Sequence, residues 1–163
     1  MCGIAGLILQ RPQPVPDGLV NGMARRLNHR GPDDSGFLAL GKSAARASRE
    51  YSPAPDTRAI LIHRRLSIID LSGGGWQPMS TPDGTRHTVF NGEIYNFIEL
   101  RNELKAGGAS FKSGSDTEVL LSAWDTWGEG ALKRFTGMFA FAMLDLKSRT
   151  VTLVRDCFGI KPL

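Results

Sequence analysis

Apolar residues in the first half of the chain form three short runs and one pattern with helical spacing. The run GIAGLIL at residues 3–9 predicts a buried strand, and shorter runs at 59–62 and 66–71 predict two more. Within residues 17–28, apolar side chains recur every three or four positions, which predicts an amphipathic helix. We therefore expect this half to contain both strands and a helix.

Polar stretches separate these elements without dividing the chain into domains. The segment NHRGPDDSG at residues 28–36 predicts a polar loop, and SGGGWQP at 72–78 predicts a glycine-rich loop. Residues 41–58 show no periodicity and contain two prolines, so we expect an exposed, mobile excursion there. No long linker and no internal repeat interrupts the sequence.

Two helices are expected in the second half, because capping patterns precede two stretches with apolar helical spacing. Asn96 and Glu99 have the three-residue spacing of a helix cap, and Ser115 and Glu118 repeat it. The glycine pair at 107–108 is expected to end the first of these helices.

The remaining apolar segments predict strands joined by tight turns. Residues 87–90 predict a strand that ends at Asn91-Gly92-Glu93, and the strands 138–146 and 150–155 flank a hairpin turn at 147–149. The continuous apolar run within the first of these two strands indicates that it is covered on both faces. This order favours an α+β fold, with antiparallel sheets layered against helices, over a doubly wound parallel sheet.

The composition is that of one folded globular domain. The chain has 163 residues, of which 41% are hydrophobic and 22% are charged, so it can bury a core and is not disordered. No run approaches the roughly 20 apolar residues of a membrane helix, and no basic lead precedes the apolar N-terminus as it would in a signal peptide. The net charge is +4, but the basic residues are scattered, which argues against nucleic-acid binding. The two cysteines form no CxxC pair, so a reducing cytoplasm is the expected location.

Cys2 is the first candidate for chemistry because it directly follows Met1. If Met1 is removed, Cys2 carries a thiol and a free α-amine on the same residue. The pKa of an α-amine is ordinarily about 7.7–8.0, so this amine can accept the thiol proton without a histidine. Gly3 would allow close approach of a substrate, and the apolar strand that follows would anchor the terminus. The alternative is an accidental cysteine at a frayed end.

Three further features, one residue pair and two single residues, have both a functional and a structural explanation. The Asn91 amide and the Gly92 N–H could donate to an oxyanion, or the pair could be a simple turn dipeptide. The Arg65 guanidinium could clamp a carboxylate, or it could be a solvated charge. Asp116 begins a predicted helix, where an acid stabilised by the helix dipole is the simpler interpretation.

Two other patterns lead to no site. The glycine run at 72–75 is not followed by the Lys-Ser/Thr of a phosphate loop. His29, His63 and His87 lie far apart, with no cysteine or acid at ligand spacing, so no metal site is expected.

Taken together, the sequence resembles the N-terminal glutaminase domain of asparagine synthetase, a class II glutamine amidotransferase. The similar segments occur in the order of that family and extend over residues 1–163: MCGIAGLI (1–8), NHRGPDDSG (28–36), HRRLSIIDL (63–71), QPM (77–79), FNGEIYN (90–96), SGSDTEVLL (113–121), GMFAFAMLD (137–145) and RDCFGIKPL (155–163). Trp76, Cys157 and the length of the 41–58 segment depart from the family's pattern.

The resemblance implies the N-terminal nucleophile hydrolase fold, a four-layer αββα sandwich of two antiparallel sheets between helices. It also implies a nucleophile: Cys2, exposed by loss of Met1, would attack the side-chain amide of glutamine. Its α-amine would act as the general base and later protonate the departing ammonia. Asn91 and Gly92 would hold the oxyanion.

The resemblance further implies how glutamine would be bound. Arg65 would pair with the substrate α-carboxylate, while Glu93 and Asp116 would bind its α-ammonium. Backbone groups of four consecutive residues would complete the pocket: Leu66, Ser67, Ile68 and Ile69.

Members of the family continue into an ATP-using synthetase domain with an SGGxDS loop, which the SGG at 72–74 does not match. We therefore expect residues 1–163 to be the amidotransferase domain without its synthetase domain. It would need no cofactor itself, because ATP and Mg belong to the absent domain. Ammonia would supply asparagine synthesis from aspartate in a synthetase domain or a separate synthetase chain, and a homodimer is left open. The alternatives are a donor domain for a sugar-acid or peptide acceptor, or a catalytically silent glutamine-binding module.

Overall fold

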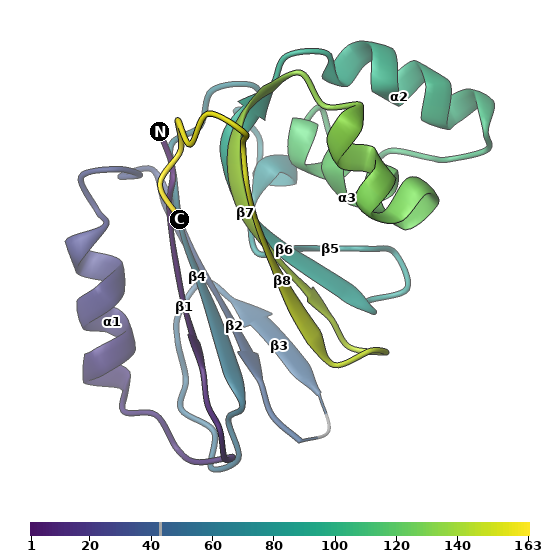
Figure 1. The fold of residues 1–163 in the computed structure, drawn as a ribbon. Coiled ribbons are helices and arrows are strands. Elements are labelled where there is room, and N and C mark those ends of the chain that lie inside the picture. Colours follow the sequence, from purple (N-terminus) through teal and green to yellow (C-terminus); the bar gives the residue numbers. More distant parts are fainter. Residues whose placement is uncertain (43) are drawn as a thin grey trace. The chain divides into compact units, whose positions relative to one another are not determined.

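The structure, a computed structural model, describes residues 1–42 and 44–163. These residues form two compact units, one of residues 1–66 and 76–78 and the other of residues 67–75 and 79–163. Each unit contains one four-stranded sheet, and the strand pairs in both sheets are antiparallel. Helices accompany both sheets (Figure 1), which agrees with the predicted α+β class.

The sheet of the first unit has the strand order β1-β4-β2-β3. The elements of this unit are β1 (Gly3–Ile8), α1 (Asp17–Arg26), β2 (Asp34–Leu40), β3 (Ala45–Ser48) and β4 (Ala59–Arg65). Val20 and Ala24 of α1 are buried in one apolar cluster with Ile60 and Ile62 of β4. The apolar stripe predicted in the 17–28 segment is therefore the face of α1 that packs on this sheet.

Two strands of the first unit are not predicted by the sequence. β2 overlaps the expected polar loop, and β3 lies in the segment expected to be an exposed excursion. Tyr51 of that segment is only 8% exposed, and its hydroxyl donates to the Val15 carbonyl at 3.1 Å. β3 is an edge strand with three of its four residues exposed, so no apolar alternation marks it. Ser43, also in that segment, lies outside the described residues.

The sheet of the second unit has the order β5-β6-β7-β8. The elements of this unit are η1 (Gly73–Gly75), β5 (Met79–Ser80), β6 (Arg86–Ile94), α2 (Phe97–Ala106), α3 (Asp116–Trp127), η2 (Gly128–Lys133), β7 (Gly137–Asp145) and β8 (Thr150–Arg155). Leu104 of α2 and Leu120 of α3 share an apolar cluster with Phe90 and Phe141 of the sheet. Six consecutive β7 residues are buried, which confirms a strand covered on both faces.

The structure corrects three further sequence predictions. Residues 66–71 form no strand, and residues 91–93 lie inside β6 instead of following its end. Asn96 does not cap α2: its Nδ2 donates to the Arg134 carbonyl at 2.9 Å, and its Oδ1 accepts from the Thr136 N–H at 2.9 Å. The side chain thus joins the start of α2 to the segment that leads into β7.

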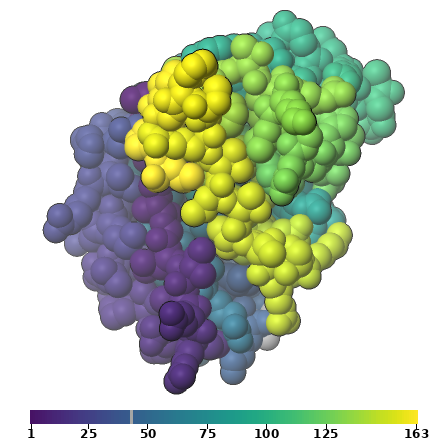
Figure 2. All heavy atoms as spheres, viewed as in Figure 1, coloured from purple at the N-terminus to yellow at the C-terminus, as the bar shows by residue number. Residues whose placement is uncertain are grey.

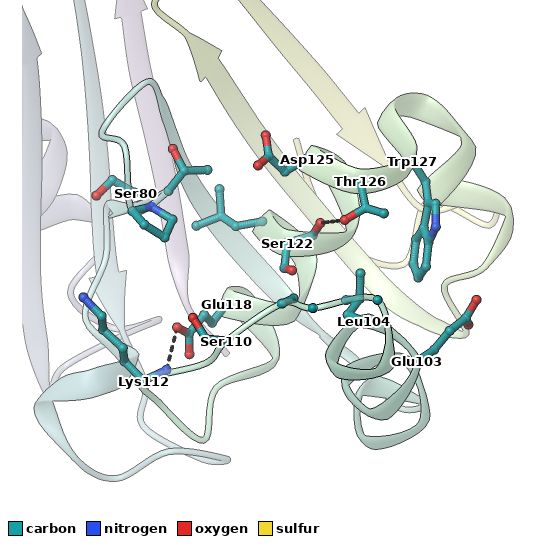
Figure 3. Close-up of a pocket in the computed structure, with 16 residues that line it drawn as sticks. Ser80, Glu103, Leu104, Ser110, Lys112, Glu118, Ser122, Asp125, Thr126 and Trp127 are labelled. Carbon is teal, nitrogen blue, oxygen red and sulfur yellow. Dashed lines mark hydrogen bonds between the residues drawn. The ribbon is translucent and has the colours of Figure 1, made fainter.

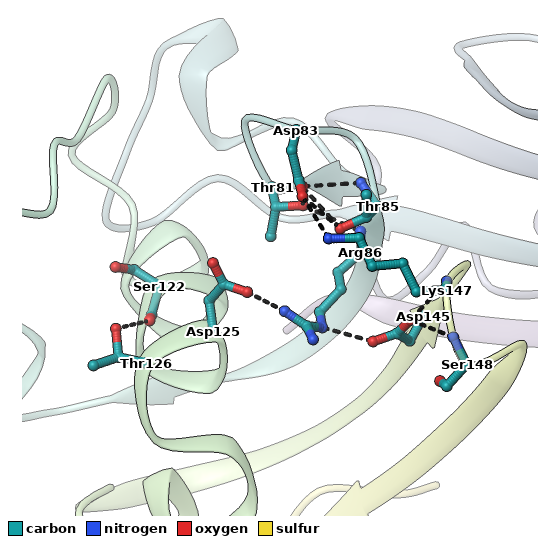
Figure 4. A network of polar contacts seen from close by, with 10 residues as sticks. All are labelled: Thr81, Asp83, Thr85, Arg86, Ser122, Asp125, Thr126, Asp145, Lys147 and Ser148. Atoms are coloured by element: carbon teal, nitrogen blue, oxygen red, sulfur yellow. Dashed lines mark hydrogen bonds and ion pairs between the residues drawn. The ribbon is translucent and has the colours of Figure 1, made fainter.

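The Ser115 cap of α3 is confirmed, because its Oγ accepts a hydrogen bond from the Thr117 N–H at 3.1 Å. The other end of α3 is tied to the sheet by Arg86 (Figure 4). The Arg86 guanidinium pairs with Asp125 of α3, and its Nε donates to Asp145 of β7 at 2.8 Å. Both ends of α3 are therefore held by polar contacts in addition to its buried apolar face.

The turn between β5 and β6 lies next to this ion pair and contains Asp83, whose ionised form is strongly favoured. Hydrogen bonds from the Thr81 hydroxyl and from the Thr85 N–H and hydroxyl hold the pKa of Asp83 well below its usual range (Figure 4). Asp83 therefore stays ionised throughout the neutral and mildly acidic range, and it orders the turn between β5 and β6.

The C-terminal segment 156–163 is ordered by one carboxylate. Asp156 accepts hydrogen bonds from the N–H groups of Phe158, Ile160 and Lys161 at 3.0–3.2 Å. Phe158 is 87% exposed, and Figure 2 shows the segment in yellow at the molecular surface. Among residues 1–42 and 44–163, no helix combines the length and the apolar character needed to cross a membrane.

Candidate active site

The Cys2 side chain is anchored by neighbouring backbone in the first unit. Its Sγ lies 3.4 Å from the Leu66 nitrogen and 3.6 Å from the Leu66 carbonyl oxygen. The Arg30 Nε donates to the Cys2 carbonyl at 3.1 Å. Because Gly3 pairs with Arg64 at the start of the β1–β4 ladder, the half-buried Cys2 continues an ordered strand. The description of a frayed end does not fit these contacts.

Gly3 meets a close neighbour, which differs from the open approach expected beside the thiol. A Cβ on Gly3 would lie 3.0 Å from the Leu27 Cβ and 3.4 Å from the Leu27 carbonyl oxygen. The absence of a side chain thus lets β1 pack against the end of α1.

Arg65 is buried at the end of β4, so the interpretation as a solvated charge is wrong. The residue is 7% exposed, and its carbonyl accepts from the Asp33 N–H at 3.0 Å. β4 lies between β1 and β2 in the sheet, which places Arg65 at the end of a central strand. A guanidinium buried in this way is suited to binding an anion, because its planar N–H donors match a carboxylate in bidentate fashion.

Ser67, Ile68 and Ile69 form part of a loop in the second unit, where Ile68 is 61% exposed. Asp70 shapes this loop: its Oδ1 accepts from the Ser72 N–H at 2.8 Å and from the Ser72 hydroxyl at 2.6 Å. The other carboxylate oxygen accepts from the Gly114 N–H at 3.0 Å. The loop is thereby joined to residues 112–115, which we call the 112–115 segment.

The geometry of β6 leaves the Gly92 N–H outside the strand ladder. Just beyond β6, the Tyr95 N–H donates across to the Thr136 carbonyl at 2.7 Å. Residues of an antiparallel pair alternate between those that bond across and those whose N–H points away. Gly92 and Ile94 therefore direct their N–H groups away from β7, and in the described part of the chain β5 pairs only with the first half of β6. Within the described residues, the Gly92 N–H is accordingly not used by either neighbouring strand and can donate a hydrogen bond to another group.

Asn91 precedes this donor and is only 1% exposed. Its buried Oδ1 has no hydrogen-bond partner among the described residues. A buried amide oxygen without a partner costs free energy, so its presence calls for an explanation. The sequence interpretation of Asn91-Gly92 as a turn dipeptide is wrong, because both residues lie within β6 and pair with β7.

Asp116 is a buried carboxyl beside Glu93. Burial raises its pKa to about 6, and the charge of Glu93 contributes in the same direction. The Ile94 N–H donates to Asp116 Oδ2 at 3.1 Å and favours the ionised form. The position at the start of α3 agrees with a helix-terminal acid, but burial and the contact with β6 make Asp116 more than a surface cap.

A hollow of about 810 Å³ lies elsewhere in the second unit, among the β5–β6 turn, α2 and α3 (Figure 3). Among the described residues, none of those predicted to form the site lines it. Its acids have structural partners: Glu118 accepts from the Lys112 N–H, and Asp125 pairs with Arg86. We therefore do not assign the active site to this hollow.

Sequence reasoning missed three residues that order the loops around Asp116, namely Asp70, Arg101 and Glu118. The only signal was the spacing of Ser115 and Glu118, which indicated a cap but not the true partners of Glu118. Among the described residues, no group of three or more His, Cys, Asp or Glu side chains could hold a metal ion.

Comparisons with known proteins identify the family of this chain. Residues 1–163 match the family model of the glutamine amidotransferase domain. The chain is 40% identical to asparagine synthetase [glutamine-hydrolyzing] 1 of Bacillus subtilis, with all of this chain and 24% of the relative covered. It is 35% identical to asparagine synthetase [glutamine-hydrolyzing] 2 of Arabidopsis thaliana, with all of this chain and 25% of the relative covered. The chain thus spans about a quarter of the length of these curated relatives.

A solved structure supports the fold independently of close sequence similarity. Glutamine phosphoribosylpyrophosphate amidotransferase from B. subtilis, complexed with ADP and GMP, superposes with a TM-score of 0.77 at 19% identity. The match covers 98% of this chain and 38% of that chain, and it confirms the predicted fold class of two antiparallel sheets with helices. Because the family model matches residues 1–163, the chain belongs to the glutamine amidotransferase domain family.

Proposed function

We propose that this domain hydrolyses glutamine to glutamate and ammonia through a thioester on Cys2. The observation that carries the proposal is the anchored thiol at the start of β1, with Sγ 3.4 Å from the Leu66 nitrogen. The printed names of the relatives describe glutamine-hydrolysing enzymes, and they match this chain over its whole length.

In the proposed first step, Met1 has been removed and the α-amine of Cys2 accepts the thiol proton. Sγ then forms a bond to the amide carbon of glutamine. The Leu66 N–H stabilises negative charge on Sγ because it is directed at the sulfur. The protonated amine gives its proton to the amide nitrogen as the C–N bond breaks, so ammonia leaves and a thioester remains.

Two neighbouring groups of β6 would stabilise the tetrahedral intermediate. The Gly92 N–H points away from the ladder, and the Asn91 side-chain amide would donate through its Nδ2, because its Oδ1 can only accept. Both belong to one paired strand, so they are preorganised before substrate arrives, which is the property that an oxyanion site requires.

Glutamine recognition would use charge at both ends of its amino-acid group. The buried Arg65 would pair with the α-carboxylate, and Asp116 with Glu93 would pair with the α-ammonium. Backbone groups of the run Leu66–Ile69 would complete the pocket. One fixed cation and two anions select an amino acid over a simple amide, because the wrong substrate would leave a buried charge unpaired.

Water would then attack the thioester carbon, with the α-amine accepting a proton from it. The C–S bond breaks, glutamate leaves and the Cys2 thiol is regenerated. We propose that the ammonia serves asparagine synthesis from aspartate in a synthetase domain that uses ATP and Mg. We place the reaction in the cytoplasm, where reducing conditions keep Cys2 as a thiol. The names of the relatives and their greater length support this destination.

The test is glutamate release from glutamine without ATP or aspartate, with the intact mass recorded on the same sample. We expect turnover and loss of Met1. Cys2→Ala should lower kcat by about 10³-fold or more while glutamine still binds. The matched control is Cys157→Ala, which changes the exposed free cysteine and should retain wild-type activity. Turnover that survives in Cys2→Ala would refute the nucleophile.

A further inference from the structure

The 112–115 segment is irregular backbone whose first three N–H groups are bound by carboxylates. Glu118 of α3 accepts from the N–H groups of Lys112 and Ser113, both at 2.8 Å. Asp70 of the preceding loop accepts from the Gly114 N–H at 3.0 Å. Charged acceptors make strong hydrogen bonds, so the segment is held from two sides despite having no strand or helix ladder.

Arg101 of α2 holds the carbonyl groups of the same segment. Its Nη1 donates to the Ser113 carbonyl at 2.9 Å, and its Nη2 donates to the Ser115 carbonyl at 3.0 Å. The guanidinium carbon lies 5.8 Å from the centre of the Phe97 ring and 5.0 Å from that of Phe111. Because the guanidinium is a rigid fork and two rings restrict it, the two carbonyl oxygens are kept at a fixed separation.

The Ser115 carbonyl belongs to the peptide bond that continues into Asp116. Ser115 is also the cap of α3, with its Oγ bound to the Thr117 N–H. On the other side, the Asp116 carboxylate accepts from the Ile94 N–H of β6 at 3.1 Å. A shift of the Ser115 carbonyl would therefore move the Asp116 carboxylate relative to β6.

We propose that Arg101 is a positioning residue for glutamine, which sets the Asp116 carboxylate for the substrate α-ammonium by holding the Ser115–Asp116 peptide. Arg101 acts through the backbone and touches no substrate. The inference rests on the proposed function, in which Asp116 binds the α-ammonium. It predicts that Arg101 controls the recognition of one end of the substrate and not the chemistry at Cys2.

The first test compares glutamine with 4-carbamoylbutanoate, which is glutamine without its α-amino group. Arg101→Lys retains the charge but cannot span both carbonyl oxygens. We expect the preference for glutamine in kcat/KM to fall about tenfold, as for a lost hydrogen bond to a charged group, with little change for the analogue. An unchanged preference, or an equal loss for both amides, would overturn the inference.

Arg134→Lys is the matched control. Arg134 lies in the same unit, 4.0 Å from the centre of the Trp127 ring, and pairs with Glu103 at 2.6 Å, but it makes no described contact with the 112–115 segment. Its replacement should leave the preference at the wild-type value. If both variants lose the preference equally, a general loosening of the unit would explain the result and Arg101 would have no special role.

Hydrogen exchange of the amides in residues 113–117 gives a readout that does not require turnover. Arg101→Lys should speed this exchange about tenfold, and Arg134→Lys should not. Unchanged exchange in Arg101→Lys would overturn the inference even if glutamine hydrolysis is found. Faster exchange in Arg101→Lys, combined with a wild-type chain that does not hydrolyse glutamine, would instead reject the proposed function, and with it the substrate role of Arg101.

Discussion

Two regions of the second unit carry proposed site residues, and different forces hold them. Residues 91–93 lie in β6, which pairs with β7 over nine consecutive positions. The 112–115 segment, which leads into Asp116 at the start of α3, has no ladder and is held by the charged groups of Asp70, Arg101 and Glu118. Backbone pairing fixes the positions of residues 91–93 whatever their side chains are, but it leaves no room for an added side-chain atom between the two strands. Charged side chains can order an irregular segment. The position of that segment then depends on single side chains and on pH.

Asn91→Ala should have the largest effect on catalysis in this comparison. Loss of an oxyanion donor lowers kcat by about 10²–10³-fold, and KM should change little. Stability should not fall, because the variant removes a buried amide oxygen that has no partner among the described residues. Steady-state kinetics and a melting curve check both parts.

Asn102→Ala, at an exposed position of α2, is the control for Asn91→Ala and should behave as wild type. A loss of kcat below about tenfold in Asn91→Ala would reject the oxyanion role.

Gly92→Ala tests the claim that the β6–β7 ladder has no room for an added side-chain atom at Gly92. An added Cβ would lie 2.4 Å from the Met138 carbonyl oxygen and 2.6 Å from the Phe139 Cα. We expect a loss of about 3 kcal/mol in the free energy of unfolding, because backbone atoms must move. A Cβ on Gly130 meets no atom within 4 Å, so Gly130→Ala should change stability by less than about 0.5 kcal/mol. Equal urea midpoints for the two variants would contradict the account.

Glutamine binding next to the 112–115 segment should depend on pH through Asp116, whose pKa is raised to about 6. The α-ammonium needs the ionised carboxylate, so KM for glutamine should rise about tenfold between pH 7 and pH 5. The variant Asp116→Asn should have a high KM that no longer follows pH in this range. A wild-type KM that is constant from pH 7 to pH 5 would remove Asp116 from substrate binding.

The same raised pKa affects stability in the opposite direction: lowering the pH weakens glutamine binding but stabilises the folded domain. The folded domain holds the Asp116 proton more strongly than the unfolded chain, whose carboxyl has a pKa of 3.8. Ionised Asp116 therefore costs stability above pH 6, and this cost is relieved as the pH falls from about 6 to about 4. Asp116→Asn should remove this part of the pH dependence.

The fold was predictable where burial imposes a pattern on the sequence. The continuous apolar run of β7 follows from its burial on both faces. The 66–71 segment misled the prediction because Ile68 and Leu71 are apolar but exposed. β3 was missed for the converse reason, since an edge strand with exposed residues needs no apolar alternation.

The site was predictable only in part, because its residues break the patterns on which strand prediction depends. Asn91 and Gly92 are typical of turns, yet they occupy a buried strand, where local rules are broken most often for function. Their proposed roles came from the resemblance to a family. Asp70 and Arg101 were not identified, because their partners are backbone groups of a loop whose path the sequence does not reveal.

The most direct test of the central claim is reaction of the chain with an electrophilic analogue of glutamine, followed by intact mass and peptide mapping. We predict one adduct per chain on Cys2, with Met1 absent and with protection by glutamine. Modification of Cys157 instead, or an adduct on Cys2 in a chain that retains Met1, would contradict the account of an N-terminal nucleophile that carries its own base.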